Sequence, residues 1–298
     1  MTQFFKIVFS LSLSILFIAC NKTDDPIPET PPVPFATQYP IDLASIDKFR
    51  AEYNITYNSD FDVTFTKVTT SNQLQAIKDQ YPVEFKTVNS NGVDYKVYYI
   101  SLRQGTQLNP TRVDSTLVEY KGSLLNETVF DRTYGNPIWF TLFNPANPGL
   151  STITGWQEII PLFKSGTITA GPNVGDPNVY DNYGAGVMFL PSGLGYYNRG
   201  STNIPAYSPL IFSFKLKSVN YVDNDFDGID SKDEGLDTSL NTDGDQFPNY
   251  FDQDDDADGY LTRSEIRING ALPTSYSLIK DCGGNITGTK KHLDKNCH

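Results

Sequence analysis

The sequence predicts an α+β domain, in which a β-sheet faces a single short helix, followed by an irregular acidic segment. Residues 95–102, 117–120 and 210–219 are rich in valine, leucine, tyrosine and phenylalanine, as strands are. Apolar residues at i, i+3, i+4 and i+7 from Trp156 form one face of a helix. Residues 223–265 contain fifteen of the 35 acidic residues but only two of the 23 basic ones. The net charge of −12 therefore belongs to one segment, and no basic patch supports nucleic-acid binding.

The elements of the domain follow in chain order. The strand 117–120 is followed by a polar turn, and a second strand starts at Val129 with an aromatic residue and a carboxylate side by side. The last strand, 210–219, places alternate apolar side chains on one face. A sheet that faces the helix at Trp156 encloses a pocket with aromatic walls and few polar groups. Such a pocket suits an apolar, kinked peptide.

Several short motifs occur here in a fixed order. They are Tyr-x-Gly at 120–122, Phe-Asp at 130–131, Phe-x-Leu at 140–142, Ile-x-Gly-Trp at 153–156, Leu-Pro-Ser-Gly-Leu-Gly-Tyr at 190–196, Asn-Ile-Pro at 203–205 and Leu-Ile-Phe at 210–212. Their order resembles FKBP-type peptidyl-prolyl isomerases over about residues 95–219. The resemblance implies an antiparallel, twisted sheet wrapped around one short helix, and catalysis of cis–trans isomerisation at X-Pro bonds without a cofactor.

By the same resemblance, nine residues would form the proline site: Tyr120, Phe130, Asp131, Phe140, Ile153, Trp156, Tyr196, Ile204 and Phe212. Trp156 would form the floor, the Tyr196 hydroxyl would bind a substrate carbonyl, and Asp131 would orient the reacting amide. Tyr197 stands where the family usually has glycine. The alternatives are that these aromatics are ordinary core, or that the fold is an inert proline-binding or chaperone module.

The acidic segment matches the twelve-residue calcium loop D-x-D-x-D-G-x₅-E twice, at 223–234 and 254–265, with a partial repeat between. The residues expected to bind structural calcium are Asp223, Asp225, Asp227, the Ile229 carbonyl, Glu234, Asp243, Asp245, Asp254, Asp256, Asp258, the Tyr260 carbonyl and Glu265. The arrangement resembles thrombospondin type 3 repeats more than paired EF-hands. The alternative to calcium binding is a solvated acidic linker. An alternative function for the whole chain is a calcium-dependent cell-surface structural module.

Residues 1–19 predict a secretory signal peptide, with Lys6 before an uncharged run of thirteen residues. The run ends at Cys20 in a motif that resembles a bacterial lipobox, so Cys20 is the expected lipidation site; the alternative is an ordinary signal peptide with an incidental cysteine. Asn21 favours an outer-membrane lipoprotein of the bacterial envelope and leaves the membrane face open. The lipid would attach the chain to the membrane, and proline-containing polypeptides would be its clients.

The remaining segments frame these parts. Residues 20–40 are rich in proline and predict an extended stalk. Residues 41–92 form an extension with no assigned chemistry, 93–220 the isomerase-like domain, 221–268 the calcium repeats and 269–298 a tail. An insertion at 167–183 predicts a hairpin near the pocket mouth. In an exported chain, Cys282 and Cys297 are expected to form a disulfide, the alternative being two free thiols.

Overall fold

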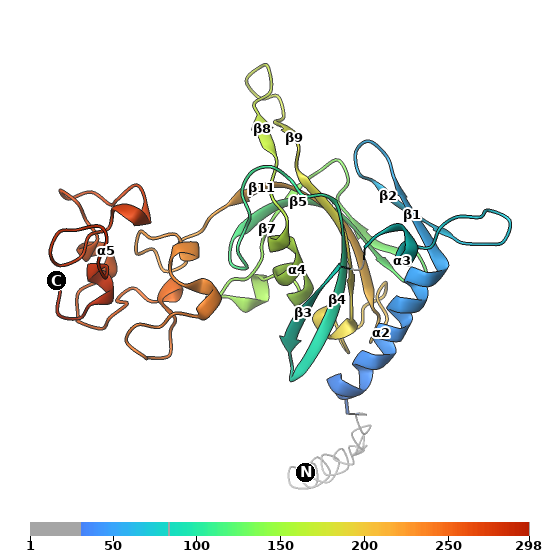
Figure 1. Cartoon of the computed structure of the whole chain (residues 1–298), viewed down its shortest axis with the longest axis horizontal. Helices are drawn as coiled ribbons and strands as arrows, with labels where there is room; N and C mark the ends of the chain where they lie inside the picture. Colours follow the sequence, from blue (N-terminus) through green and yellow to red (C-terminus); the bar gives the residue numbers. More distant parts are fainter. Residues whose placement is uncertain (1–30, 83, 298) are drawn as a thin grey trace, which may run out of the picture. The chain divides into compact units, whose positions relative to one another are not determined.

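The computed structural model describes residues 31–82 and 84–297, within a unit that starts at Pro34. The signal peptide, Cys20 and most of the stalk lie outside the described residues. The elements, shown in Figure 1, are α2 (Phe35–Glu52), β1 (Tyr53–Tyr57), β2 (Val63–Lys67), α3 (Ile77–Gln80), β3 (Glu84–Ser90), β4 (Val93–Arg103), β5 (Ser115–Leu124), β6 (Val129–Arg132), β7 (Ile138–Thr141), α4 (Thr154–Ile159), β8 (Thr167–Thr169), β9 (Val179–Asp181), β10 (Gly184–Leu190), β11 (Leu210–Asn220) and α5 (Thr262–Glu265). No helix in this part of the chain is long and apolar enough to cross a membrane.

A twisted, seven-stranded sheet forms the centre of the domain. Its strand order is β3-β4-β10-β11-β5-β6, every pairing is antiparallel, and β7 pairs with the first half of β5. The apolar side chains of α4 pack against one face of this sheet, where they meet alternate residues of β11. The predicted fold class, an antiparallel sheet around one short helix, is confirmed, and Figure 1 shows α4 inside the curve of the strands.

The sheet is buried on its second face as well. Ile46 and Phe49 of α2, with residues of the β1–β2 hairpin, pack against Tyr98, Phe189 and other sheet residues that point away from α4. Two-sided burial explains why every residue of β10 is buried, without the alternation that a half-exposed strand has. Residues 35–67, which include the first part of the predicted extension, therefore cover the face of the sheet opposite α4. Their burial against the sheet makes them part of the same folded domain.

Two predicted boundaries are wrong. Helix α2 already begins at Phe35, so residues 35–40 are not part of an extended stalk, and Pro40 lies inside the helix. Proline removes one helical hydrogen bond there, but contacts of Tyr39 with Tyr95 and with the backbone N–H of Lys96 hold the turn in place. Strand β3 belongs to the central sheet, which therefore begins before residue 93.

The insertion at 167–183 contains the β8–β9 hairpin, as the sequence predicts. None of its residues lines the aromatic pocket described below, which contradicts the expected position at the pocket mouth. Beyond β11 the acidic segment has one α-helical turn, α5, and short 3₁₀ turns. Leu236 and Tyr250 of this segment pack with Val113, which precedes β5. Cys282 and Cys297 form a disulfide in the tail, with Cα atoms 5.6 Å apart.

Candidate functional site

An aromatic pocket of about 250 Å³ opens between the sheet and α4. Strands β5, β6, β7 and β11 and helix α4 each contribute to its wall, and the turn before α4 and the loop after β10 complete the rim. The lining residues are Tyr120, Phe130, Asp131, Phe140, Leu150, Ser151, Thr152, Ile153, Trp156, Tyr196 and Phe212. The pocket is therefore mainly apolar, with its polar groups confined to a few positions.

Trp156 forms the floor of this pocket. Its ring is nearly perpendicular to those of Tyr120 and Phe212, with centroids 5.1 and 5.3 Å away, and it lies 5.4 Å from Phe140. Edge-to-face packing of this kind stabilises each ring pair by ~0.5–1.5 kcal/mol beyond area burial. The indole Nε1 is buried and has no hydrogen-bond partner among the residues described. The rings thus hold one another in place while the open side of the pocket stays free.

Two phenolic hydroxyls and one carboxylate are the titratable groups among the described residues that line the pocket. The Tyr120 hydroxyl donates to Asp131 Oδ2, and the backbone N–H of Arg132 donates to Oδ1 of the same carboxylate at 2.8 Å. Burial and the hydrogen bond to Asp131 raise the pKa of Tyr120 well above its ordinary value. Burial, aided by the charge of Asp131, also raises the pKa of Tyr196. Both phenols therefore remain neutral donors at physiological pH.

The loop that carries Tyr196 is attached to α2. Asp42 is buried, and its Oδ2 accepts from both the backbone N–H and the hydroxyl of Ser192, at 2.7 and 2.6 Å. The next residue after Tyr196, Tyr197, has φ of +51°, in the left-handed region that glycine favours. Its ring stacks on Phe35 of α2, with centroids 3.9 Å apart. Contacts with α2 thus stabilise Tyr197 in a backbone conformation that glycine would adopt without strain. They also hold the neighbouring Tyr196 in place.

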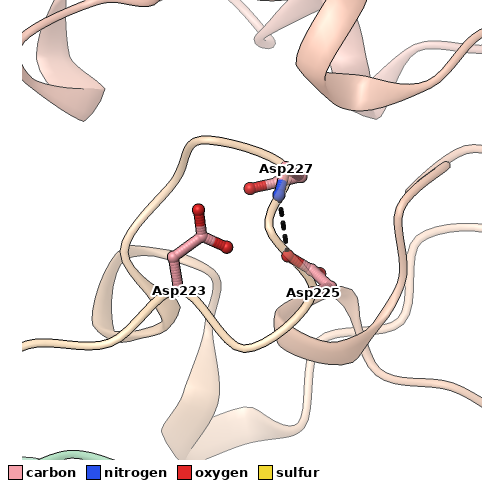
Figure 2. A group of neighbouring side chains, drawn as sticks. All are labelled: Asp223, Asp225 and Asp227. Carbon is pink, nitrogen blue, oxygen red and sulfur yellow. Dashed lines mark hydrogen bonds between the residues drawn. The ribbon is translucent and has the colours of Figure 1, made fainter.

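The first acidic loop directs three carboxylates toward one point. Figure 2 shows Asp223, Asp225 and Asp227 facing one another, and one oxygen of each lies within 4.8 Å of the others. The backbone N–H groups of Asp227 and Ile229 donate to Asp225 and Asp227, at 3.2 and 2.7 Å, and Gly228 makes the turn with φ of +103°. These bonds orient the carboxylates inward.

The second loop repeats this arrangement. Asp254, Asp256 and Asp258 form another such group, and the N–H groups of Asp258 and Tyr260 donate to Asp256 and Asp258, at 3.3 and 2.7 Å. A third, more exposed group contains Asp243, Asp245 and Asp252. A fourth joins Asp227 and Glu234 of the first loop to Asp255, which the calcium motif does not include.

Several of these carboxylates are buried without hydrogen-bond partners in the described chain. Both oxygens of Glu234, Asp255 and Glu265 are buried and have no hydrogen-bond partner among the residues described. Burial, followed by the charges of neighbouring aspartates, raises the pKa of Glu234 to about 11, of Asp255 to about 9 and of Glu265 to about 8. Unpaired buried carboxylates are costly, so this oxygen-only set is matched to a hard cation such as calcium.

Comparison with known proteins assigns the sheet domain to a family. "Peptidyl-prolyl cis-trans isomerase FKBP15-1" of Arabidopsis thaliana is 32% identical over 132 residues, which are 43% of this chain and 68% of that protein. The chain belongs to the FKBP family of peptidyl-prolyl cis-trans isomerases. "Peptidyl-prolyl cis-trans isomerase Mip" of Coxiella burnetii is 33% identical over 133 residues, 44% of this chain and 46% of that protein. The chain spans about half or less of the length of the curated bacterial relatives it matches.

Two further comparisons concern structure and the acidic segment. The crystal structure of FkpA from Escherichia coli aligns with a TM-score of 0.36 and 21% identity, over 62% of this chain and 60% of that chain. The model of the family described as "BamM C-terminal" matches residues 224–288. That range includes both acidic loops except Asp223, together with α5 and Cys282.

The structure brings eight of the nine expected proline-site residues to the wall of the FKBP pocket. The exception, Ile204, packs against the core beside it and does not line the pocket. Ile204 belongs to a tight turn in which its carbonyl accepts from the N–H of Ser201 at 2.7 Å. Ile138, on β7, is about half exposed and is also absent from the wall.

Sequence reasoning missed several residues. Leu150, Ser151 and Thr152 complete the rim, and no motif marks them because their position depends on the turn before α4. Asp255 was missed because it stands between two motif ligands. In this loop every second residue is a ligand, so the side chain of the residue between two ligands points to the opposite side of the chain. This alternation is the one sequence signal that could have indicated Asp255. Of the metal ligands expected from sequence, Glu265 is buried near its loop but lies outside the three-carboxylate groups.

Proposed function

We propose that this FKBP-family chain catalyses cis–trans isomerisation of X-Pro bonds in exported or envelope proteins. The observation that carries the proposal is the aromatic pocket, with Trp156 as its floor. Among the described residues that line it, only Tyr120, Asp131 and Tyr196 have charged or phenolic groups. A hollow of about 250 Å³ is of a size to take a proline ring and its flanking amide. Membership of the family supports the same reaction.

The physical basis of catalysis is a difference in polarity between two forms of the amide. Resonance keeps the X-Pro bond planar, with a rotational barrier of ~18–20 kcal/mol, and places negative charge on the carbonyl oxygen. The twisted amide loses this resonance and is less polar. An apolar pocket therefore binds the twisted form better than the planar one, and every ~1.4 kcal/mol of this preference gives a tenfold rate increase.

The polar groups orient the substrate. Tyr196 is neutral and half exposed at the rim, so its hydroxyl can donate to the carbonyl of a peptide that enters from solvent. Asp131 is held by Tyr120 and by the N–H of Arg132, which fixes its charge beside the site of rotation. No nucleophile or cofactor takes part in this reaction scheme.

A protease-free assay with a proline-containing peptide tests the proposal. We expect the wild-type chain to accelerate isomerisation, and the double variant Tyr196→Phe, Asp131→Ala to lose most of this activity. The competing function is a binding or chaperone module that uses the same groove. Peptide binding by wild-type chain without acceleration of isomerisation supports that alternative and excludes the enzyme.

We also propose that the acidic segment binds structural calcium. Both loops contain buried carboxylates, and those of Glu234 and Glu265 have no hydrogen-bond partner among the described residues. A divalent cation would remove the repulsion between these groups, which supports the proposal. Calorimetric titration of the full chain with calcium, after treatment with chelator, should give saturable binding. A third candidate function is a calcium-dependent surface module. It requires that the chain binds a partner, that chelator abolishes this binding, and that substitutions in the pocket leave it unchanged.

The proposed location is the bacterial envelope, with the chain attached through a lipid on Cys20. This residue and the leader before it lie outside the described part of the chain. The Cys282–Cys297 disulfide supports export, because such bonds persist in oxidising compartments. Metabolic labelling with a fatty acid, compared between the wild-type chain and Cys20→Ala, tests the attachment.

A further inference from the structure

Asp255 belongs by sequence to the second acidic loop but by position to the first. Asp254, Asp256 and Asp258 converge on one side of their loop, and Asp255, between two of them, points elsewhere. One of its carboxylate oxygens lies within 4.8 Å of ligand atoms of both Asp227 and Glu234. The first loop is therefore completed by a carboxylate from a residue about twenty positions further along the chain.

The described residues around Asp255 provide little compensation for its charge. The residue is 2% exposed, and neither carboxylate oxygen has a hydrogen-bond partner in the described chain. Glu234, which it faces, is 3% exposed and has both oxygens unpartnered. The imidazole of His292 lies beside Asp255, with Nε2 3.9 Å from Oδ2. A group of opposite charge held among the three carboxylates would offset the cost of burying this set.

Other contacts between the loops fix this geometry. Gln253 Nε2 donates to the carbonyl of Asp225 at 2.5 Å, and Arg263 Nη1 donates to that of Phe226 at 2.7 Å. Both bonds run from the second loop to the backbone of the first. They hold the second loop in the position that turns Asp255 inward.

We propose that Asp255 is a ligand of the cation in the first loop, so that one calcium centre is shared by both loops. This inference rests on the proposed calcium binding and adds a ligand that lies outside the twelve-residue motif. It follows that the first ion joins the two loops, and that the second loop loses part of its order when this ion leaves.

Calcium titration of Asp255→Asn in the full chain tests the shared centre. We expect the affinity of one site to fall by about tenfold or more, since calcium affinity depends on the number of charged ligands. The matched control is Asp230→Asn, which removes the same charge from the same segment. Asp230 is half exposed, pairs with Lys232 at 2.7 Å and lies outside the carboxylate groups of the described chain. The calcium affinity of Asp230→Asn should therefore stay within about twofold of wild type.

Thermal unfolding with calcium and with chelator gives an independent readout. In chelator, Asp255→Asn should be at least as stable as the wild-type chain, because it removes a buried carboxyl group that has no hydrogen-bond partner in the described chain. In calcium the order should reverse. Asp255→Glu, which keeps the charge but displaces the oxygens, should lower affinity without raising stability in chelator, and it replaces Asp255→Asn if that variant does not fold.

The outcomes separate this inference from the proposed function. Absence of calcium binding by the wild-type chain overturns both. If Asp255→Asn binds calcium as the wild-type chain does, and its stability changes in the same direction in calcium and in chelator, only the role of Asp255 as a ligand is overturned. Lower affinity together with the reversal of stability supports the shared centre.

Discussion

The ring of Phe35, in the first turn of α2, stacks on Tyr197, with centroids 3.9 Å apart and an interplanar angle of 18°. Tyr197 follows the pocket residue Tyr196 and has a left-handed backbone, a conformation that costs a non-glycine residue ~1–2 kcal/mol. The stack offsets part of this cost. A residue of α2 thus stabilises the conformation of a loop at the rim of the aromatic pocket.

Phe35→Ala should therefore affect both stability and substrate binding. We expect a loss of ~1 kcal/mol in the free energy of unfolding, the size of an aromatic pair, and a rise in KM larger than the change in kcat. Denaturant titration and steady-state kinetics measure these quantities. Ile41→Ala is the control, because Ile41 is exposed on the same helix. Equal effects of the two variants would show that the stack does not position the loop.

Tyr95 makes a pH-dependent contribution to stability. Its hydroxyl is buried without a partner among the described residues, and burial, followed by the charge of Tyr197, raises its pKa from 10.0 to about 12. Between these values the unfolded chain loses its proton while the folded chain keeps it. The free energy of unfolding contributed by Tyr95 is thus complete below pH 10 and declines as the pH rises toward 12.

Tyr95→Phe should reduce this alkaline decline. At pH 7 we expect the variant to be as stable as the wild-type chain or more stable, since an unsatisfied buried hydroxyl costs ~1–3 kcal/mol. Denaturant titrations at pH 7 and pH 11 measure both effects. A clear loss of stability at pH 7 would mean that the hydroxyl has a partner in solution.

The disulfide should stabilise the tail and leave the pocket unchanged. Cys282 and Cys297 are fifteen residues apart, and closure of such a loop is worth ~3 kcal/mol in the chain-entropy model. Reduction should therefore lower the melting temperature of the acidic segment and tail, monitored by calorimetry in calcium. Isomerase activity should be unaffected, because neither cysteine contacts the pocket. Loss of activity on reduction would contradict this separation.

Regular periodicity made much of the fold predictable from sequence. Leu210, Phe212, Phe214 and Leu216 do share the face that covers α4, and the spacing from Trp156 does mark a helix and its apolar face. Both patterns arise from burial on one side, which leaves a period in the sequence.

The remainder was hidden because the buried residues are polar. The face of α2 toward the sheet begins with Gln38 and Asp42, which bond to each other at 2.7 Å, so hydrophobicity marks only the second half of the helix. On β11, Lys215 is buried against Asp62 and Glu119, at 2.6 and 3.3 Å. Such residues are predicted as exposed from sequence, since their partners lie far away along the chain.

The most direct test of the central proposal is the rate of cis–trans exchange in an X-Pro peptide, measured by NMR with catalytic amounts of the full chain. Phe140 lines the pocket, whereas its neighbour Trp139 on β7 is half exposed and does not. We expect the wild-type chain and Trp139→Ala to accelerate exchange equally, and Phe140→Ala to lose about tenfold, the effect of ~1.4 kcal/mol. An exchange rate with wild-type chain equal to that in buffer, or full activity of Phe140→Ala, would contradict the proposal.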